Sequence, residues 1–247
     1  MRDMSGMTVG RYRLIGPTEQ REHGGVVWQC SCLRCGAERM LSVRQAERAC
    51  CRLCLVRDGY ALGILWALCS CSGDKHVVRC ADEHYVRYIA DITGGAVWTR
   101  EDDGREQYVT VVPAAMMAAV VDMGWSGRWD TARSCPVTPD PWGFAAAYIQ
   151  AHSTVDTTTT RKRDGSRHTR LRLRVYGSEA VLSAINDTIA DAGLGKRKTV
   201  MTGRCATLYY QSTAEVQAIV EEILDGVHSD VFAAQVAQAR IRLATTS

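Results

Sequence analysis

The sequence predicts an α+β fold made of two similar halves and preceded by a small cysteine-rich module. Two short helices rich in small apolar residues lead the halves, and they align at an offset of 84 when Ala67 is placed on Ala151. The same order of strand and helix signals follows each of them. Six cysteines gather in residues 30–54, ahead of both. With 247 residues, 46% of them hydrophobic and 23% charged, the chain has the composition of an ordinary globular protein.

The cysteine-rich module predicts a structural metal. Its cysteines are Cys30, Cys32, Cys35, Cys50, Cys51 and Cys54. Cys32/Cys35 and Cys51/Cys54 form two C-x-x-C pairs, at a spacing typical of a four-thiolate zinc site. The two spare cysteines each neighbour a pair and could replace one of its members, and a set of reactive thiols is the alternative. Four sulfur ligands leave no open coordination position, so we expect Zn²⁺ to fold residues 1–57, a segment without its own core.

The composition also bears on location. The chain has no run of about 18 or more apolar residues, so no transmembrane helix and no membrane partner are expected. Its N-terminal residues have no apolar stretch long enough for a signal peptide. We therefore expect a cytoplasmic, intracellular protein whose thiols stay reduced.

The repeated pattern gives a domain plan. We expect the module at 1–57, a first repeat at 58–124, a linker at 125–141, a second repeat at 142–228 and a C-terminal helix within 229–247. After its leading helix, the first repeat should contain a strand at 76–80, a helix at 83–92, strands at 96–99 and 107–112, and a helix at 114–123. The second should contain a basic hairpin, a helix at 178–192, strands at 198–201 and 206–211, and a helix at 213–224. Each repeat is thus predicted as αββαββα.

Local signals support the helices of the second repeat. Ser178 and Thr213 are good N-cap residues, and Gly193 suits the position after a helix C-terminus. Apolar side chains follow both caps at helical spacing. In the tail, the larger apolar residues should dock on the protein's own body or on a second copy; they are Val231, Phe232, Val236 and Ile241.

Residues 161–175, RKRDGSRHTRLRLRV, concentrate positive charge. Seven of them are Lys or Arg and one is Asp, in a chain whose formal net charge is only +3. Asp164-Gly165 is a strong hairpin signal, and arginines then alternate with apolar residues from 170 to 175. Successive side chains of a strand point to opposite faces, so this segment predicts a ribbon with one basic face. Such a ribbon fits the major groove of B-DNA, and arginine suits phosphates and guanine edges. An edge strand that uses charge to prevent aggregation is the alternative.

The leading segments, ALGILWALCSCSGD and FAAAYIQAHSTVDT, together with the repeated order, resemble the LAGLIDADG homing-endonuclease fold over about residues 58–226. Gly63 and Ala147 match its close-packing position, and Cys69 and Ser153 its final glycine. The resemblance implies two leading helices packed at a pseudo-twofold axis. It also implies two four-stranded sheets that form a saddle over the DNA major groove.

The chain departs from that family at the catalytic positions. There the family has an acidic residue at the end of each leading helix, where it binds divalent metal. This sequence has Leu68 and His152. Mg²⁺ requires oxygen ligands to activate water on a phosphodiester. The next acids, Asp74 and Asp156, lie beyond the helix ends, so no catalytic residue is expected.

The DNA-binding residues are expected on the open faces of the two sheets. In the second repeat they are Arg161, Lys162, Arg163, Arg167, His168, Arg170, Arg172, Arg174, Lys196, Arg197, Lys198 and Arg204. In the first they are Lys75, His76, Arg79, Arg100 and Arg105. Because the two sets are unequal, we expect a monomer on an asymmetric site.

The sequence therefore predicts a sequence-specific protein of double-stranded DNA that does not cut. A transcriptional regulator or repressor of phage or mobile-element origin fits this combination. One alternative is an active homing endonuclease with displaced acids. The other is a structural module that binds RNA or an acidic protein.

Overall fold

The computed structural model describes residues 3–22, 24–48, 50–128, 130, 132–161, 163–195, 197, 199–202 and 205–246. Four of the predicted DNA-binding residues lie outside the described residues: Lys162, Lys196, Lys198 and Arg204. Among the helices described, none combines the length and the apolar character that crossing a membrane requires.

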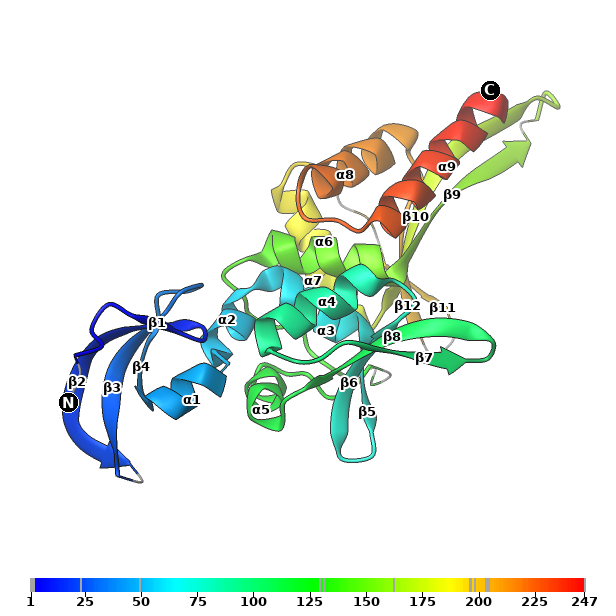
Figure 1. Cartoon of the computed structure of the whole chain (residues 1–247). Coiled ribbons are helices and arrows are strands. Elements are labelled where there is room, and N and C mark those ends of the chain that lie inside the picture. The colour runs from blue at the N-terminus through cyan, green and yellow to red at the C-terminus, as the bar shows by residue number, and fades with distance from the viewer. Residues whose placement is uncertain are drawn as a thin grey trace.

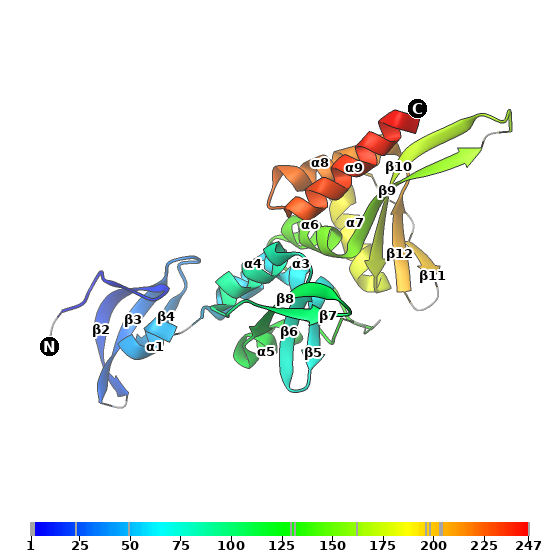
Figure 2. The ribbon, with the colours of Figure 1, turned by 45° about the vertical axis from the view of Figure 1, so that its right-hand side comes forward.

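The N-terminal module is a four-stranded antiparallel sheet with two short helices. Its elements are β1 (Thr8–Val9), β2 (Tyr12–Glu22), β3 (Gly25–Cys32), β4 (Glu38–Ser42), α1 (Val43–Arg48) and α2 (Arg52–Arg57). Tyr12, Leu14 and Trp28 are buried in it, and α1 packs on β3 and β4. The expectation that this segment lacks a core was wrong, because alternating apolar residues of β2 and β3 supply one. In Figure 2 the sheet stands apart from the rest of the chain and is joined to it through α2.

The two repeats have the predicted order of elements. The first contains α3 (Gly59–Leu68), β5 (Cys69–Ser72), β6 (Lys75–Cys80), α4 (Glu83–Thr93), β7 (Trp98–Asp102), β8 (Arg105–Val112) and α5 (Ala114–Asp122). The second contains α6 (Pro141–His152), β9 (Ser153–Arg161), β10 (Arg167–Gly177), α7 (Glu179–Asp191), β11 (Thr199–Thr202), β12 (Cys205–Tyr210) and α8 (Thr213–Asp225). The sheets run β5-β6-β8-β7 and β9-β10-β12-β11, so the strand order is also repeated. The predicted α+β class with two αββαββα repeats is confirmed.

The leading helices α3 and α6 lie side by side at the centre of the molecule (Figure 1). Every residue of α3 is buried. Both helices begin with an aspartate cap: Asp58 accepts from the N–H of Ala61 at 2.9 Å, and Asp140 from the N–H of Gly143 at 2.8 Å. A Cβ on Gly63 would lie 2.4 Å from the carbonyl oxygen of Phe144, so the small residue permits the close contact.

The remaining helix signals had mixed outcomes. Gly193 follows α7 with φ +75°, as predicted. Ser178 occupies the N-cap position, but its hydroxyl donates to the carbonyl oxygen of Arg133 at 3.3 Å rather than capping α7. The prediction for Thr213 was wrong: Ser212 is the N-cap of α8, and the Thr213 hydroxyl accepts from the N–H of Leu171 at 3.1 Å.

The tail forms α9 (Asp230–Thr246), which docks on the protein's own second sheet. It packs against β9 and β10 (Figure 1). Phe232 and Val236 of this helix are buried, whereas Val231 and Ile241 are exposed. Of the two docking modes left open by the sequence, the structure shows the intramolecular one.

Replacing Gly63 by alanine is expected to lower the free energy of unfolding by about 1–3 kcal/mol, because the added methyl overlaps a backbone carbonyl that cannot move freely. Helix propensity alone would favour alanine by about 1 kcal/mol, so a loss isolates the packing effect. Chemical denaturation measures it. Gly16→Ala is the control, since a Cβ there meets nothing within 4 Å and should change stability by less than about 0.5 kcal/mol. Equal effects of the two substitutions would contradict the close packing.

Candidate nucleic-acid interface and metal centre

Strand β10 separates apolar and basic side chains onto opposite faces of the second sheet. Leu171, Leu173 and Val175 are buried beneath the helices that cover that face. The intervening arginines, Arg170, Arg172 and Arg174, are partly exposed on the opposite face. The alternation predicted from the sequence is therefore present in the fold.

Asp156 of β9 binds two of these arginines. Nε and Nη2 of Arg172 donate to its two carboxylate oxygens, each at 2.8 Å, and Nη2 of Arg174 donates at 2.7 Å. Burial opposes ionisation of this carboxyl, but the hydrogen bond and charge of Arg172, with those of Arg174, hold its pKa below the ordinary value. Arg170 makes no ion pair within the described part of the chain. Asp156 belongs to the basic face, although sequence reasoning had considered it only as a displaced catalytic acid.

The tip of the β9–β10 hairpin carries four further predicted residues, all exposed: Arg161, Arg163, Arg167 and His168. The turn between them is fixed by Asp164, whose carboxylate accepts from the N–H of Ser166 at 2.9 Å. Gly165 has φ +84°, as a tight hairpin turn requires. The hairpin extends outward beside α9 in both views (Figures 1 and 2). It thus presents a cluster of positive charge at the far end of the sheet.

Arg197 lies elsewhere. Its guanidinium forms an ion pair with Glu215 of α8, a helix on the covered face of the sheet. The structure therefore does not bring Arg197 together with the arginines of β10. The sequence could not show this, because Glu215 comes from a separate helix.

The first sheet has a sparser basic face. Strand register places Arg79, Arg100 and Arg105 on one face, which Lys75 shares by alternation along β6. Arg79 pairs with Asp102 at 3.1 Å. These four basic residues thus lie on one side of the sheet together with the acidic Asp102, as expected.

His76 differs from this set. It is in register with Val112, a buried core residue, so its side chain lies on the other face. There its ring meets that of Trp125 edge-on, with the centroids 5.4 Å apart. Including His76 in the basic face overlooked the alternation of β6.

The linker contributes residues that the sequence analysis missed. Arg128 lines a hollow with Arg79, Asp102 and Arg105 on the basic face of the first sheet. Arg133 is only 2% exposed; it donates to the carbonyl oxygen of Trp66 and, at 3.0 Å, to the hydroxyl of Tyr148. These contacts join the last turn of α3 to α6, so the linker is part of the packed centre.

The ends of the leading helices hold no free carboxylate among the described residues. Leu68 is buried. The Nδ1–H of His152 donates to the carbonyl oxygen of Tyr176 at 2.9 Å. Burial lowers the pKa of this imidazole, and the charges of Arg128 and Arg133 lower it further. A lone imidazole without carboxylate ligands beside it does not make a Mg²⁺ site.

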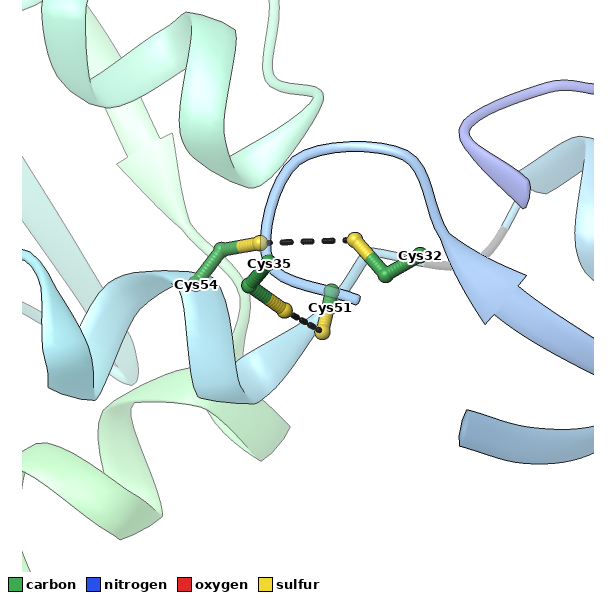
Figure 3. A group of neighbouring side chains, drawn as sticks. All are labelled: Cys32, Cys35, Cys51 and Cys54. Carbon is green, nitrogen blue, oxygen red and sulfur yellow. Dashed lines mark hydrogen bonds between the residues drawn. The ribbon is translucent and has the colours of Figure 1, made fainter. Parts of the chain in front are cut away.

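The four paired cysteines meet at one point (Figure 3). The sulfurs of Cys32 and Cys54 lie 3.5 Å apart, as do those of Cys35 and Cys51, and all four are within 4.8 Å of one another. A tetrahedral zinc with bonds of about 2.3 Å would separate its sulfurs by about 3.8 Å. Elsewhere in the described chain, no three potential ligands converge in this way. The residues fit a soft, four-coordinate metal ion.

The spare cysteines have other contacts. Cys30 donates to the carbonyl oxygen of Trp28 at 3.4 Å inside the sheet, and Cys50 donates to that of Thr93. At the cluster, burial opposes ionisation of Cys32, yet backbone N–H groups, those of Cys35 and Arg34 foremost, lower its pKa to about 7. A thiolate is the form that binds metal.

The cluster is tied to the centre of the fold. Arg34, between the first pair of cysteines, forms an ion pair of 2.6 Å with Asp58, the cap of α3. The hydroxyl of Tyr88 donates to the same carboxylate at 3.1 Å. A metal that fixes this loop would therefore also help to fix the start of α3.

No protein-family model and no curated protein matches this sequence. Solved structures do match its fold. The meganuclease I-SmaMI bound to uncleavable DNA is 9% identical, with a TM-score of 0.51 over 72% of this chain and 86% of that one. The LAGLIDADG meganuclease I-AabMI bound to uncleaved DNA is 8% identical, with a TM-score of 0.51 over 75% and 92%. I-CpaMI, also bound to uncleaved DNA, is 11% identical, with a TM-score of 0.50 over 76% and 92%. The chain has a LAGLIDADG homing-endonuclease-like fold, and the predicted resemblance is confirmed.

The paired substitution Cys51→Ser with Cys54→Ser is expected to reduce bound metal from about one ion per chain to none, because two of the four thiolates are removed. Mass spectrometry of desalted protein measures the stoichiometry. Cys50→Ser serves as the control and should keep its metal, since Cys50 contacts Thr93 instead. Loss of metal in the control, or its retention in the paired variant, would show that a different set of cysteines binds the ion.

Proposed function

We propose that this protein binds double-stranded DNA sequence-specifically without cutting it, as a transcriptional regulator or repressor of phage or mobile-element origin. The observation that carries the proposal is the partly exposed row of arginines, Arg170, Arg172 and Arg174, on the face of β10 opposite its apolar core. Guanidinium groups on a two-stranded ribbon match the width and the acceptor pattern of the major groove. Solved proteins of the same fold are described as bound to DNA.

The proposed lack of cleavage rests on the centre of the molecule. Metal-assisted hydrolysis of a phosphodiester needs carboxylate oxygens that hold Mg²⁺. Leu68 and His152 stand at the positions that the resemblance assigns to the catalytic acids, and Asp156 is engaged by two arginines. Arg133 adds a fixed positive charge beside Trp66 and Tyr148. This positive charge further disfavours the binding of a metal cation near that point.

We further propose that the cysteine cluster holds Zn²⁺ with a structural role. Four thiolates suit zinc and leave it no open position for substrate. Through Arg34 and Asp58, the ion would link the module at 1–57 to α3. We propose that the first repeat spans 58–124, the linker 125–141, the second repeat 142–228 and the C-terminal segment 229–247. We also propose that the protein binds an asymmetric DNA site as a monomer.

Replacing Arg170, Arg172 and Arg174 together by glutamine is expected to weaken binding to a duplex selected with the wild-type protein by about a hundredfold or more, with binding still measurable at low salt. The slope of log K against log salt should become less steep, by about 0.9 for each phosphate that the variant no longer neutralises. Fluorescence anisotropy at several salt concentrations measures both. The control is Arg87→Gln, which removes an arginine bound to Glu83 on α4 and should leave affinity unchanged. Unchanged binding by the triple variant would refute the role of the ribbon.

Incubation with a duplex library and Mg²⁺ or Mn²⁺ is expected to give no strand breaks, because no free carboxylate pair lies at the helix ends within the described residues. Sequencing of the ends detects rare cleavage. Breaks at a defined site would instead support the active endonuclease with displaced acids. Competition among duplex DNA, RNA and heparin tests the other alternative, since preference for RNA or heparin would favour a module for RNA or acidic proteins.

A further inference from the structure

One carboxylate sits in the middle of the proposed DNA-binding face. Asp156 lies directly opposite Arg172 in the β9–β10 register. Its side chain is 23% exposed, and those of Arg172 and Arg174 are 25% and 27% exposed. An acid at this position reduces the attraction of the face for phosphates, so simple electrostatic binding does not account for it.

The hydrogen bonds show what the carboxylate does. Asp156 occupies Nε and Nη2 of Arg172, which form one edge of that guanidinium. An arginine has five N–H donors in a fixed fork. The N–H groups at the far end of the Arg172 guanidinium do not bond to Asp156. Their direction is nevertheless fixed, because the guanidinium is rigid and its other edge is held. Arg174 is held through one nitrogen of its own, which donates to the same carboxylate.

We propose that Asp156 is a positioning residue that orients Arg172 and Arg174 to recognise guanine edges in the major groove. This rests on the proposed function. Two parallel N–H groups on arginine match O6 and N7 of guanine, a contact that discriminates only when the fork is correctly directed. The end of Arg172 that Asp156 leaves unused provides such a pair.

The other basic residues of the hairpin differ in this respect. Arg170 has no ion pair among the described residues, and Arg161, Arg163 and Arg167 are exposed at the hairpin tip. Long cationic side chains that no carboxylate orients suit phosphates, which carry no sequence information. The hairpin is thereby divided into an outer part for the backbone and an inner part for bases.

The first sheet offers a weaker counterpart. Arg79 and Asp102 make a single contact of 3.1 Å, and both side chains are 41% exposed. A single exposed contact orients a guanidinium less than the three hydrogen bonds around Asp156 do. Guanine recognition is therefore assigned to the second half, which makes the site asymmetric.

The test compares Asp156→Asn with Asp164→Asn. Both remove one negative charge from the same hairpin, but the Asp164 carboxylate contacts Ser166 in the turn and, within the described chain, no arginine. Affinities are measured for a duplex selected with the wild type, for the same duplex with each guanine replaced in turn, and for an unrelated duplex. Circular dichroism checks that both variants are folded.

Asp164→Asn should raise affinity for all duplexes alike and leave their ratio unchanged. Asp156→Asn should lower the ratio of selected to unrelated duplex by about tenfold or more, with the preference abolished at particular guanines. Arg172→Lys, which keeps the charge but not the fork, should lose the preference for the same guanines. Arg172→Lys keeps the proposal testable if the Asp156→Asn variant does not fold.

The outcomes separate the two proposals. If the wild type prefers its selected duplex and a folded Asp156→Asn variant keeps that preference, or if Arg172→Lys keeps it, the positioning role is overturned while DNA binding stands. If the wild type shows no preference for any duplex, the proposed function fails and the positioning role fails with it.

Discussion

The contact between α3 and α6 is the constraint on which the rest of the structure depends. Gly63 lets the helices approach until a methyl group no longer fits beside the carbonyl oxygen of Phe144. Strand β5 begins directly after α3, and β9 directly after α6, so each sheet inherits the direction of one helix. Any shift of this helix pair therefore moves the two basic faces relative to one another. A densely packed interface is suited to this, because it transmits displacement instead of absorbing it.

On the second sheet, one strand serves both stability and recognition. The buried Leu171 and Leu173 anchor β10, and the same alternation turns Arg172 outward. A slip of one residue would exchange the two faces, so the apolar core selects against it. The Asp164-Gly165 turn sets the register from one end, and the bonds between Arg172 and Asp156 are consistent with it in the middle. The chemistry of the open face is therefore controlled by the packing of the covered face.

Much of this fold follows from local sequence signals, since periodicity, turn residues and the repeat specify both αββαββα halves. Long-range contacts account for most of the failures, while the error at His76 comes from overlooking the alternation along its own strand. His76 was assigned by its residue type, whereas its strand places it against Trp125. The Thr213 hydroxyl bonds β10 instead of its own helix, and Arg197 binds Glu215. Asp156 and Arg133 acquire their roles only when distant segments meet, which composition and spacing do not reveal. The cysteines are the exception, because their spacing itself encodes the geometry of a tetrahedral site.

At the centre of the interface between α3 and α6, helix packing is combined with the electrostatic effect of Arg133. The C-terminal end of a helix carries partial negative charge, which favours a cation. Arg133 meets this preference at α3 by donating to the carbonyl oxygen of Trp66, and it reaches Tyr148 of α6 as well. Because this guanidinium is part of the chain, no metal ion held by carboxylates is needed to offset the partial negative charge at the end of α3. Burial lowers the pKa of His152, and the charges of Arg128 and Arg133 act in the same direction. Within the proposed function, the C-terminal end of α3 is thus stabilised by a covalently attached cation, while on the open face of the second sheet the carboxylate of Asp156 directs arginines.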